Sequence, residues 1–369
     1  MDRHPNDLTP DAEIAAELDA AAAHAASRGA PEAAAELFEH AAKLTPPEQP
    51  DEIYRRRREA AAHHFAAGDI ERARAIAEEM LDELESGPWR SDMLVLLASG
   101  VEDEQEATEL CRQAVKEAGG DEDRLAAAYL ALAIACSILG DFSQQVDAQC
   151  EALVHAGRGS DRRLLVEALQ GVGIVTVLSG GAIDEKIMQQ AIAIDREELT
   201  LPAYHCPSFW YGMQLYWLDE LEHARPILSA ELERAQREGE LIDSLQILTP
   251  LIEVEMRSGN WELAERMADE GLGQAIDTGF EYIIRGLGFQ RLQLAVFRGE
   301  IEKSRRGLAE QMAEAERAKA HWQMLALISA AGFFELSLGD AREAWRWLEP
   351  ALERQDKLGR DISLSLPLY

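Results

Sequence analysis

Apolar and small side chains recur at intervals of three and four residues along most of the chain. In the stretch Trp261–Thr278 they fall at Trp261, Ala264, Ala268, Leu272, Ala275 and Ile276. This is the spacing of one face of an amphipathic α-helix. No run of alternating polar and apolar residues bounded by turn signals indicates a β-strand. The pattern therefore predicts an all-α protein.

Between the helical stretches a turn recurs about every forty residues, in most cases a glycine followed by an acidic residue or asparagine. The turn positions are Gly68, Gly140, Gly180, Gly259, Gly299 and Gly339, and Asp219 takes the glycine place in one unit. A fixed period of this size is typical of a solenoid, in which each unit buries its apolar face only by stacking on its neighbours.

Small residues flank these turns on both sides. Seven residues before the turn stand Ala61, Ala133, Gly173, Gly212 and Gly332, with Ile252 and Leu292 as exceptions, and five residues after it stand Ala73, Ala224, Ala264, Ser304 and Ala344. Two helices joined by a tight turn approach closely only where both lack bulk. The spacing resembles that of the tetratricopeptide repeat, whose usual period is about 34 residues, so the units here carry longer helices.

We therefore predict a right-handed superhelical solenoid of about nine antiparallel helix hairpins. The hairpins are expected near residues 12–44, 50–86, 88–118, 122–157, 161–199, 207–239, 241–278, 281–319 and 321–358. A disordered lead is expected over 1–11, the repeat array over 12–360, and the start of a truncated further repeat over 361–369.

Three local features refine this prediction. Pro226, Pro250 and Pro350 lie inside predicted helices and should kink or interrupt them. Thr45, with Glu48 three residues later, fits a capping box at the start of a helix. The hairpin at 88–118 has the weakest turn, because Val101–Glu104 contains no glycine.

The charge of the chain argues against nucleic acid as a partner. The net charge is −32, with 36 basic and 68 acidic residues, so the surface as a whole should repel a phosphate backbone. The run Arg55–Arg58 spreads around a helix and favours a solvated face with ion pairs over a basic patch. The N-terminus carries no secretory signal, and no uncharged stretch reaches the roughly 20 residues of a bilayer span, which indicates a cytoplasmic protein without membrane contact.

A search for catalytic motifs favours a protein that is not an enzyme and needs neither cofactor nor metal. No lysine follows a glycine, which excludes a P-loop, and Gly171-Val-Gly173 and Gly271-Leu-Gly273 lack the third glycine of a dinucleotide fingerprint. The nine histidines form no HExxH motif and the four cysteines no CxxC pair. His205-Cys206 is the only candidate nucleophile pair, and neighbours in sequence seldom have the geometry for proton transfer.

One segment stands out as a candidate recognition surface for a protein or small-molecule effector. Residues 208–217 hold five of the chain's 23 aromatics, and Trp210, Tyr211, Gln214 and Trp217 are the residues we expect to line the concave groove. The alternative, which the need of every repeat helix for a buried side favours, is that Phe209, Tyr216 and Trp217 form the core of their hairpin. A second candidate set lies in later first helices, the helices expected along the concave wall, and comprises Arg285, Gln290, Arg291 and Trp322.

Several stretches resemble the helical-repeat region of the large ATP-binding transcription regulators of the LuxR type. These stretches are residues 18–41, His63–Asp69, Met256–Ala264 and Phe334–Asp340, and the resemblance covers nearly the whole chain. In that family a nucleotide-binding module precedes the repeats and a helix-turn-helix follows them, and the repeats are taken to hold the inducer site or a partner surface. This chain has no P-loop and ends at Tyr369 without a basic recognition helix.

Two hypotheses follow. The first is a non-catalytic regulatory repeat segment of a LuxR-type regulator, which binds an effector or partner protein in its groove. Under this hypothesis the chain is a piece of a longer regulator, or its gene has lost both the nucleotide-binding module and the helix-turn-helix. The second is a freestanding repeat scaffold for protein–protein interaction. The end at Tyr369 falls within what reads as a further repeat, and apolar surface exposed there would promote self-association.

Overall fold

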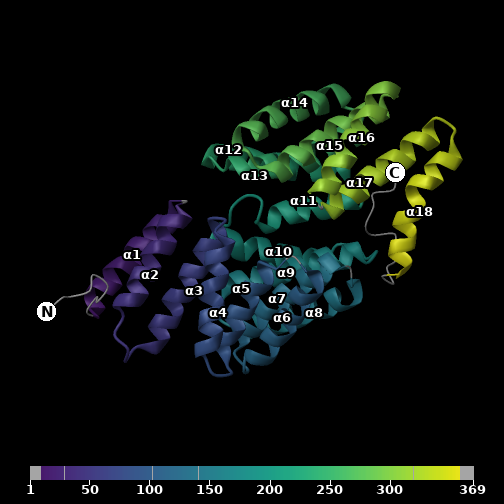
Figure 1. The fold of residues 1–369 in the computed structure, drawn as a ribbon. Helices are drawn as coiled ribbons and strands as arrows, with labels where there is room; N and C mark the ends of the chain where they lie inside the picture. Colours follow the sequence, from purple (N-terminus) through teal and green to yellow (C-terminus); the bar gives the residue numbers. More distant parts are fainter. Residues whose placement is uncertain (1–9, 29, 102, 140, 319, 358–369) are drawn as a thin grey trace. The chain divides into compact units, whose positions relative to one another are not determined.

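The computed structural model describes residues 10–28, 30–101, 103–139, 141–318 and 320–357. These residues form eighteen α-helices and one π-helical turn, with no β-strand among them (Figure 1). Most of the predicted lead over 1–11 and the predicted further repeat over 361–369 lie outside the described residues. The chain divides into two compact units, residues 1–168 and 169–369, and each is described by itself.

The first unit holds α1 (Ala12–Ser27), α2 (Pro31–Leu44), α3 (Pro50–Ala66), α4 (Ile70–Glu83), α5 (Pro88–Ser99), α6 (Glu104–Glu117), α7 (Glu122–Leu139) and α8 (Phe142–Ala156). Helix α9 (Arg162–Leu178) crosses the division. The second unit continues with α10 (Glu185–Ile194), the π-helical η1 (Asp195–Leu199), α11 (Pro207–Trp217), α12 (Leu221–Glu238), α13 (Leu241–Arg257), α14 (Trp261–Thr278), α15 (Glu281–Phe297), α16 (Ile301–Arg317), α17 (His321–Ser337) and α18 (Ala341–Lys357).

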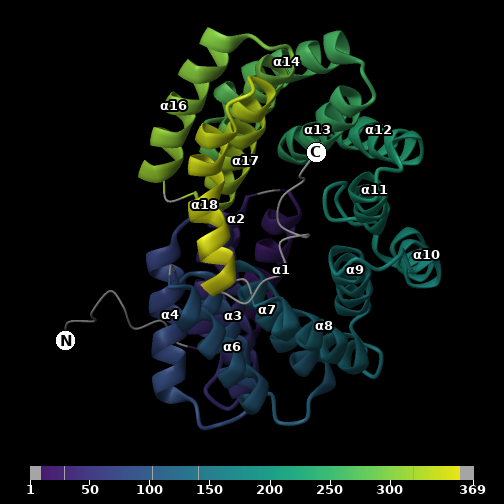
Figure 2. The same ribbon diagram turned by 90° about the vertical axis from the view of Figure 1, so that its right-hand side faces the viewer.

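Consecutive helices pack as hairpins within each unit. In the first unit α1 packs on α2, α3 on α4, α5 on α6 and α7 on α8; in the second, α11 packs on α12, α13 on α14, α15 on α16 and α17 on α18. Figure 2 shows α11, α12 and α13 as such neighbours. The prediction of an all-α helical-repeat solenoid is confirmed, and these eight helix pairs coincide with eight of the nine predicted hairpins. The predicted hairpin at 161–199 corresponds to α9, α10 and η1.

The turns adopt the left-handed backbone conformation that glycine favours. The φ angle is 84° at Gly68, 81° at Gly180, 82° at Gly259, 69° at Gly299 and 82° at Gly339. Asp219, in the glycine place of its unit, has a φ of 65°. Aspartate tolerates this region better than most side chains, which explains how it can replace glycine there. Gly140 lies outside the described residues.

The small residues beside the turns lie where paired helices touch. Ala73, Ala224, Ala264 and Ser304 are all fully buried. A Cβ atom added to Gly212 would stand 2.9 Å from Leu228 Cδ2, and one added to Gly332 would stand 2.8 Å from Leu348 Cδ2. The helices therefore approach more closely at these positions than any side chain on the first helix would allow.

Two local predictions are wrong in part. Helices α12, α13 and α18 continue through Pro226, Pro250 and Pro350 without interruption. Thr45 does not begin a helix but ends α2, and its hydroxyl donates to Ala41 O at 2.7 Å. Because prolines follow Thr45 directly, the next helix starts only at Pro50, a residue whose fixed φ suits the first helical position.

The arginine run Arg55–Arg58 lies in α3, and most of its side chains form ion pairs. Arg55 pairs with Asp19, Arg57 with Glu83 and Arg58 with Glu59. Arg56 is buried and donates to Thr45 Oγ1 at 2.6 Å. The expected ion pairs are present, but the run is not solvated throughout, because Arg56 faces the core.

The turn without glycine joins α5 to α6. Helix α5 ends before Gly100, and Asp103 caps α6 through its side chain.

Candidate functional site

The first helices of successive hairpins lie side by side in the second unit. Helix α11 contacts α13, α13 contacts α15, and α15 contacts α17, in addition to the contacts within each hairpin. Side chains that leave these helices on the side away from their hairpin partners can therefore form one continuous surface.

The aromatic segment of α11 is divided between surface and core. The rings of Trp210 and Trp217 have their centroids 6.4 Å apart, and both residues are partly exposed. Phe209 and Tyr216 are buried, at 1% and 5% exposure. Phe209 and Tyr216 therefore belong to the core of their hairpin, as the alternative interpretation expected. Trp217 does not, because it lies with Trp210 at the surface.

Gln214 and Tyr211 do not join the ring pair of the two tryptophans, because each contacts α10 instead. The Gln214 side chain is fully buried, and its amide nitrogen lies 3.2 Å from Met188 Sδ. Tyr211 donates its hydroxyl to Glu185 Oε1 at 3.0 Å, across to α10. Both residues therefore connect α11 to α10.

A connection between η1 and α11 adds Tyr204 to the aromatic cluster and is bound to the α13 hairpin. Its backbone is held by side chains, since Ala203 N donates to Glu240 Oε2 and Tyr204 N to Asp243 Oδ2, each at 3.1 Å. The Tyr204 ring centroid lies 6.0 Å from that of Trp210. Burial raises the pKa of the Tyr204 hydroxyl, and the charges of Tyr282 and Asp243 raise it further.

The second predicted set is not brought together. Arg291 pairs with Asp269 of α14 at 2.6 Å, so it points to the preceding hairpin. Arg285 lies 3.9 Å from Glu281 on its own helix. The side chain of Trp322 lies outside the described residues.

Gln290 lies on one side of α15 together with Gly286 and Gln293, two residues that the sequence analysis missed. Gly286 has no atom within 4 Å of the position a Cβ would take, so open space lies beside the helix there. Gln290 and Gln293, four and seven residues later on the same face, are 4% and 6% exposed. Neither side-chain oxygen has a hydrogen-bond partner among the described residues. Half-exposed Tyr282 stands one turn before Gly286.

The aromatic cluster at α11 and the residues of α15 lie on hairpins that α13 connects, since α13 contacts both helices. We call the two groups together the aromatic–amide face; its residues are Tyr204, Trp210, Trp217, Tyr282, Gly286, Gln290 and Gln293. The signal in the sequence was a glycine in mid-helix with glutamines four and seven residues later. Amide side chains both donate and accept hydrogen bonds but do not titrate, and phenols titrate only far above neutral pH. The face is suited to binding and not to proton transfer.

The candidate nucleophile pair has a structural role. Cys206 caps α11, its sulfur accepting from Phe209 N at 3.4 Å and donating to Ala203 O at 3.2 Å. Burial raises the pKa of the Cys206 thiol to about 12. The thiol therefore stays protonated near neutral pH and is a poor nucleophile.

Among the described residues no three histidine, cysteine, aspartate or glutamate side chains gather as a metal site. No helix in the described part of the chain combines the length and apolar character that crossing a membrane requires.

Comparisons with known proteins show a shared fold. The sequence matches no protein-family model, and no curated protein is detectably similar to it. Among solved structures, a Rap protein complexed with competence and sporulation factor has a TM-score of 0.64 at 12% identity, over 95% of this chain and 99% of that one. Aspartyl phosphate phosphatase F from Bacillus subtilis has a TM-score of 0.52 at 11% identity, over 99% and 98%.

A third similar structure belongs to a larger protein. The signal transduction ATPase with numerous domains from Pyrococcus horikoshii, which has a tetratricopeptide-repeat sensor, has a TM-score of 0.51 at 12% identity. The alignment covers 89% of this chain and 47% of that protein, so the chain is similar to about half of it. At these identities the likeness supports a tetratricopeptide-like helical repeat and nothing finer.

Proposed function

We propose that this chain is a helical-repeat module that binds a peptide or protein partner along the aromatic–amide face. The observation that carries the proposal is the pairing of an open glycine with two buried, unsatisfied amide oxygens on one face of α15.

Gly286 lowers the stability of α15, and no packing contact compensates for this loss. Glycine in a helix interior destabilises the helix by about 1 kcal/mol relative to alanine. Gly212 and Gly332 meet side chains of the paired helix, whereas nothing stands beside Gly286, as is also true of Gly273 in α14. A position kept free of side chain beside open space is what the close approach of a ligand to a helix backbone requires.

The amide oxygens of Gln290 and Gln293 supply the specific contacts. A buried acceptor without a partner costs about 1–3 kcal/mol, which a ligand N–H group would recover on binding. A peptide backbone offers such donors at regular intervals. Tyr282, Trp210 and Trp217 add partly exposed aromatic area, the side-chain type that contributes most to binding in protein interfaces.

The test is selection of peptides on the immobilised protein from a phage-displayed library of random twelve-residue peptides. The affinities of the selected peptides are then measured by fluorescence anisotropy. We expect Gly286→Leu and Gln290→Leu to weaken binding at least tenfold.

Gly288→Ala is the matched control, because Gly288 lies two residues from Gly286 on another side of α15, where its carbonyl accepts from Gln311 Nε2 at 3.0 Å. It should bind the selected peptides as the unmodified protein does. Failure to enrich any peptide, or equal binding by all variants, would overturn the proposal.

In its finer form the proposal makes this module the regulatory repeat segment of a LuxR-type transcription regulator. The support is the resemblance of the repeat stretches together with the likeness to a repeat sensor within a larger signalling ATPase. An antibody against this chain should then detect a protein far above 40.9 kDa in its host. The same gene should encode a P-loop and a helix-turn-helix.

A freestanding interaction scaffold is the second candidate. The observation that favours it is the alignment with the Rap protein, which covers nearly the whole of both chains. A band at 40.9 kDa in the host would support this candidate over the first.

Both candidates are non-catalytic. The assay that would contradict this is hydrolysis of an aspartyl phosphate, the chemistry named for one similar structure. We expect the chain to leave the lifetime of a phosphorylated receiver domain unchanged. A shortened lifetime that persists at catalytic amounts of the chain would refute a purely binding role.

A further inference from the structure

Large apolar side chains are exposed at the turns of four consecutive hairpins in the second unit. Leu218 is 40% exposed, Ile301 43% and Leu338 40%, and Trp261 and Leu263 are each 38% exposed. Each lies within four residues of its left-handed turn residue, namely Asp219, Gly259, Gly299 or Gly339. We call these five residues the turn strip.

Helix packing places the members of the turn strip in a row. All four turns follow first helices, and each first helix contacts the next one in the order α11, α13, α15, α17. Packed helices are separated by about 8–10 Å, so neighbouring turns should stand about that far apart. A single exposed apolar residue needs no explanation, but a row with one at every turn is typical of an interaction surface.

The row is bordered by acidic side chains. Glu220 and Glu222 follow Leu218, Glu262 follows Trp261, Glu302 follows Ile301, and Asp340 follows Leu338, all of them exposed. Three of the cations near the turns are engaged in ion pairs: Arg257 with Asp219, Arg298 with Glu265, and Lys303 with Glu300. The local field is therefore negative, as is that of the whole chain.

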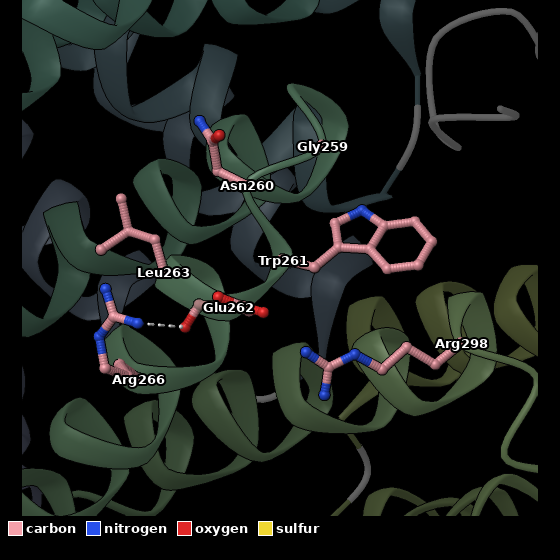
Figure 3. Close-up of a pocket in the computed structure, with 7 residues that line it drawn as sticks. All are labelled: Gly259, Asn260, Trp261, Glu262, Leu263, Arg266 and Arg298. Atoms are coloured by element: carbon pink, nitrogen blue, oxygen red, sulfur yellow. Dashed lines mark hydrogen bonds between the residues drawn. The ribbon is translucent and has the colours of Figure 1, made fainter.

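A hollow of about 670 Å³ opens in the middle of the row. It is lined by Gly259, Asn260, Trp261, Glu262, Leu263, Arg266 and Arg298. Figure 3 shows Glu262 between Trp261 and Arg298 on one side and Leu263 and Arg266 on the other. Trp261 is fixed by its indole N–H, which donates to Met256 O at 2.9 Å. An apolar side chain that enters the hollow would meet Trp261 and Leu263, and a basic side chain beside it would face the acidic border outside the hollow.

We propose that the turn strip binds a basic amphipathic helix of a partner protein. Seven helical residues rise about 10.5 Å, which matches the separation of neighbouring turns, so apolar residues repeated every heptad would meet successive members of the strip. Lysine and arginine beside them would face the acidic border. A second copy of this chain is disfavoured as the occupant, because it would bring two acidic borders together. The turn strip adjoins the aromatic–amide face at Leu218, which follows Trp217, but Gly286 and Gln290 lie within α15 and not at a turn of the strip.

The probe is a synthetic fluorescein-labelled peptide of three heptads, with leucine at two positions and lysine at three positions of each heptad and alanine elsewhere. A scrambled peptide and a peptide with glutamate for lysine serve as comparisons. Binding is followed by fluorescence anisotropy at low and at high salt. We expect the basic amphipathic peptide to bind at least tenfold more tightly than either comparison, and to weaken at least tenfold at high salt.

The double variant Leu263→Ser/Ile301→Ser should bind this peptide at least tenfold more weakly. Ile276→Ser removes an apolar residue that is 59% exposed near the opposite end of α14 from the Gly259 turn, and it should leave binding unchanged. Gly286→Leu should also leave it unchanged, which separates this surface from the proposed peptide face. Equal binding of the scrambled peptide, or equal loss in Ile276→Ser, overturns the proposal. A dimer in sedimentation that Leu263→Ser/Ile301→Ser converts to monomer would also overturn it, since a second copy would then occupy the strip.

Discussion

Arg225 of α12 donates a 2.7 Å hydrogen bond from Nε to Oε1 of Glu255 in the next hairpin, where the glutamate is almost fully buried. Eighty residues later, two periods along the repeat, Arg305 stands 3.2 Å from the buried Glu335 in the same arrangement. Glu255 and Glu335 each precede their turn glycine by four residues. Two units of the repeat therefore share an ion pair between hairpins, whereas the unit between them has Glu265 and Ala295 at these positions.

Replacing Arg225 should destabilise the second unit. Arg225→Met leaves the Glu255 carboxylate buried with Asn260 as its remaining side-chain partner, a 2.6 Å hydrogen bond. An unpaired buried charge is costly, and we expect the free energy of unfolding to fall by about 2–3 kcal/mol. Urea unfolding followed by circular dichroism measures this change.

Two further variants make the ion-pair prediction specific. In Arg225→Met/Glu255→Gln the buried charge is gone, so part of the lost stability should return. Arg163→Met breaks an exposed pair with Glu167 and should cost less than about 1 kcal/mol. If the double variant is no more stable than Arg225→Met, the cost does not arise from the buried carboxylate.

Glu39 should make the stability of the first unit depend on pH. Hydrogen bonds from Arg72 and then His64 hold the pKa of Glu39 at about 2, against 4.5 for a free glutamate. Since the pKa is lowered in the folded state, the stabilisation is fully present above pH 4.5 and is lost as the pH falls toward 2. Its full size is about 3 kcal/mol.

The comparison with Glu39→Gln isolates this contribution from those of other carboxyl groups. The unmodified protein should exceed the variant in unfolding free energy at pH 7, and the difference should shrink steadily below pH 4.5. A difference that stays constant down to pH 2.5 would mean that charge on Glu39 does not stabilise the fold.

The helices and turns of this fold were predictable because local properties of the chain determine them. The small residues and the left-handed turns at Gly259 and Asp219 each reflect one residue's own conformational range. The pairing of Arg225 with Glu255 was not predictable, since it joins residues thirty positions apart through the packing register of two hairpins. The prediction that Thr45 begins a helix was wrong, because its hydroxyl donates to Ala41 O at the end of α2 and accepts from the buried Arg56.

The candidate site was predictable only in part, for the same reason. Trp210 and Trp217 lie seven residues apart, so helix geometry alone brings them together. Gln214 also lies near that face, but α10 packs there and buries it against Met188. Arg291 turns to α14 because Asp269 offers it a partner. Only packing between hairpins decides which side of a first helix remains open.

Thr200 should be a site at which glycine stabilises the protein. It follows η1 with a φ of 54°, a left-handed conformation that is costly for a β-branched residue. Thr200→Gly should raise the free energy of unfolding by about 1 kcal/mol, after the larger entropy of unfolded glycine is counted. The reverse change, Gly239→Ala at a φ of 77°, should lower it by about 1 kcal/mol. A loss of stability in Thr200→Gly would show that the threonine side chain has a role beyond its backbone.

Replacing Gly286 by alanine should stabilise the protein but weaken peptide binding. Gly286→Ala and Gly288→Ala add a methyl group without a clash, and each should raise the free energy of unfolding by about 0.5–1 kcal/mol through helix propensity. Only Gly286→Ala should weaken the peptides selected on the unmodified protein. If Gly286→Ala gains stability with no loss of binding, the open position does not serve a ligand.

The four thiols should differ sharply in reactivity. Cys150 is exposed, whereas Cys111, Cys136 and Cys206 are buried. Burial raises their pKa values to about 12, 11 and 12 respectively, so little thiolate forms near neutral pH. With an aromatic disulfide reagent at pH 8, the native protein should release one equivalent of chromophore quickly and the other three only on unfolding. Cys150→Ser should abolish the fast phase and Cys206→Ser should leave it intact. If the fast phase instead disappears in Cys206→Ser, Cys206 is an activated nucleophile. That result would contradict the proposal that the chain is not an enzyme.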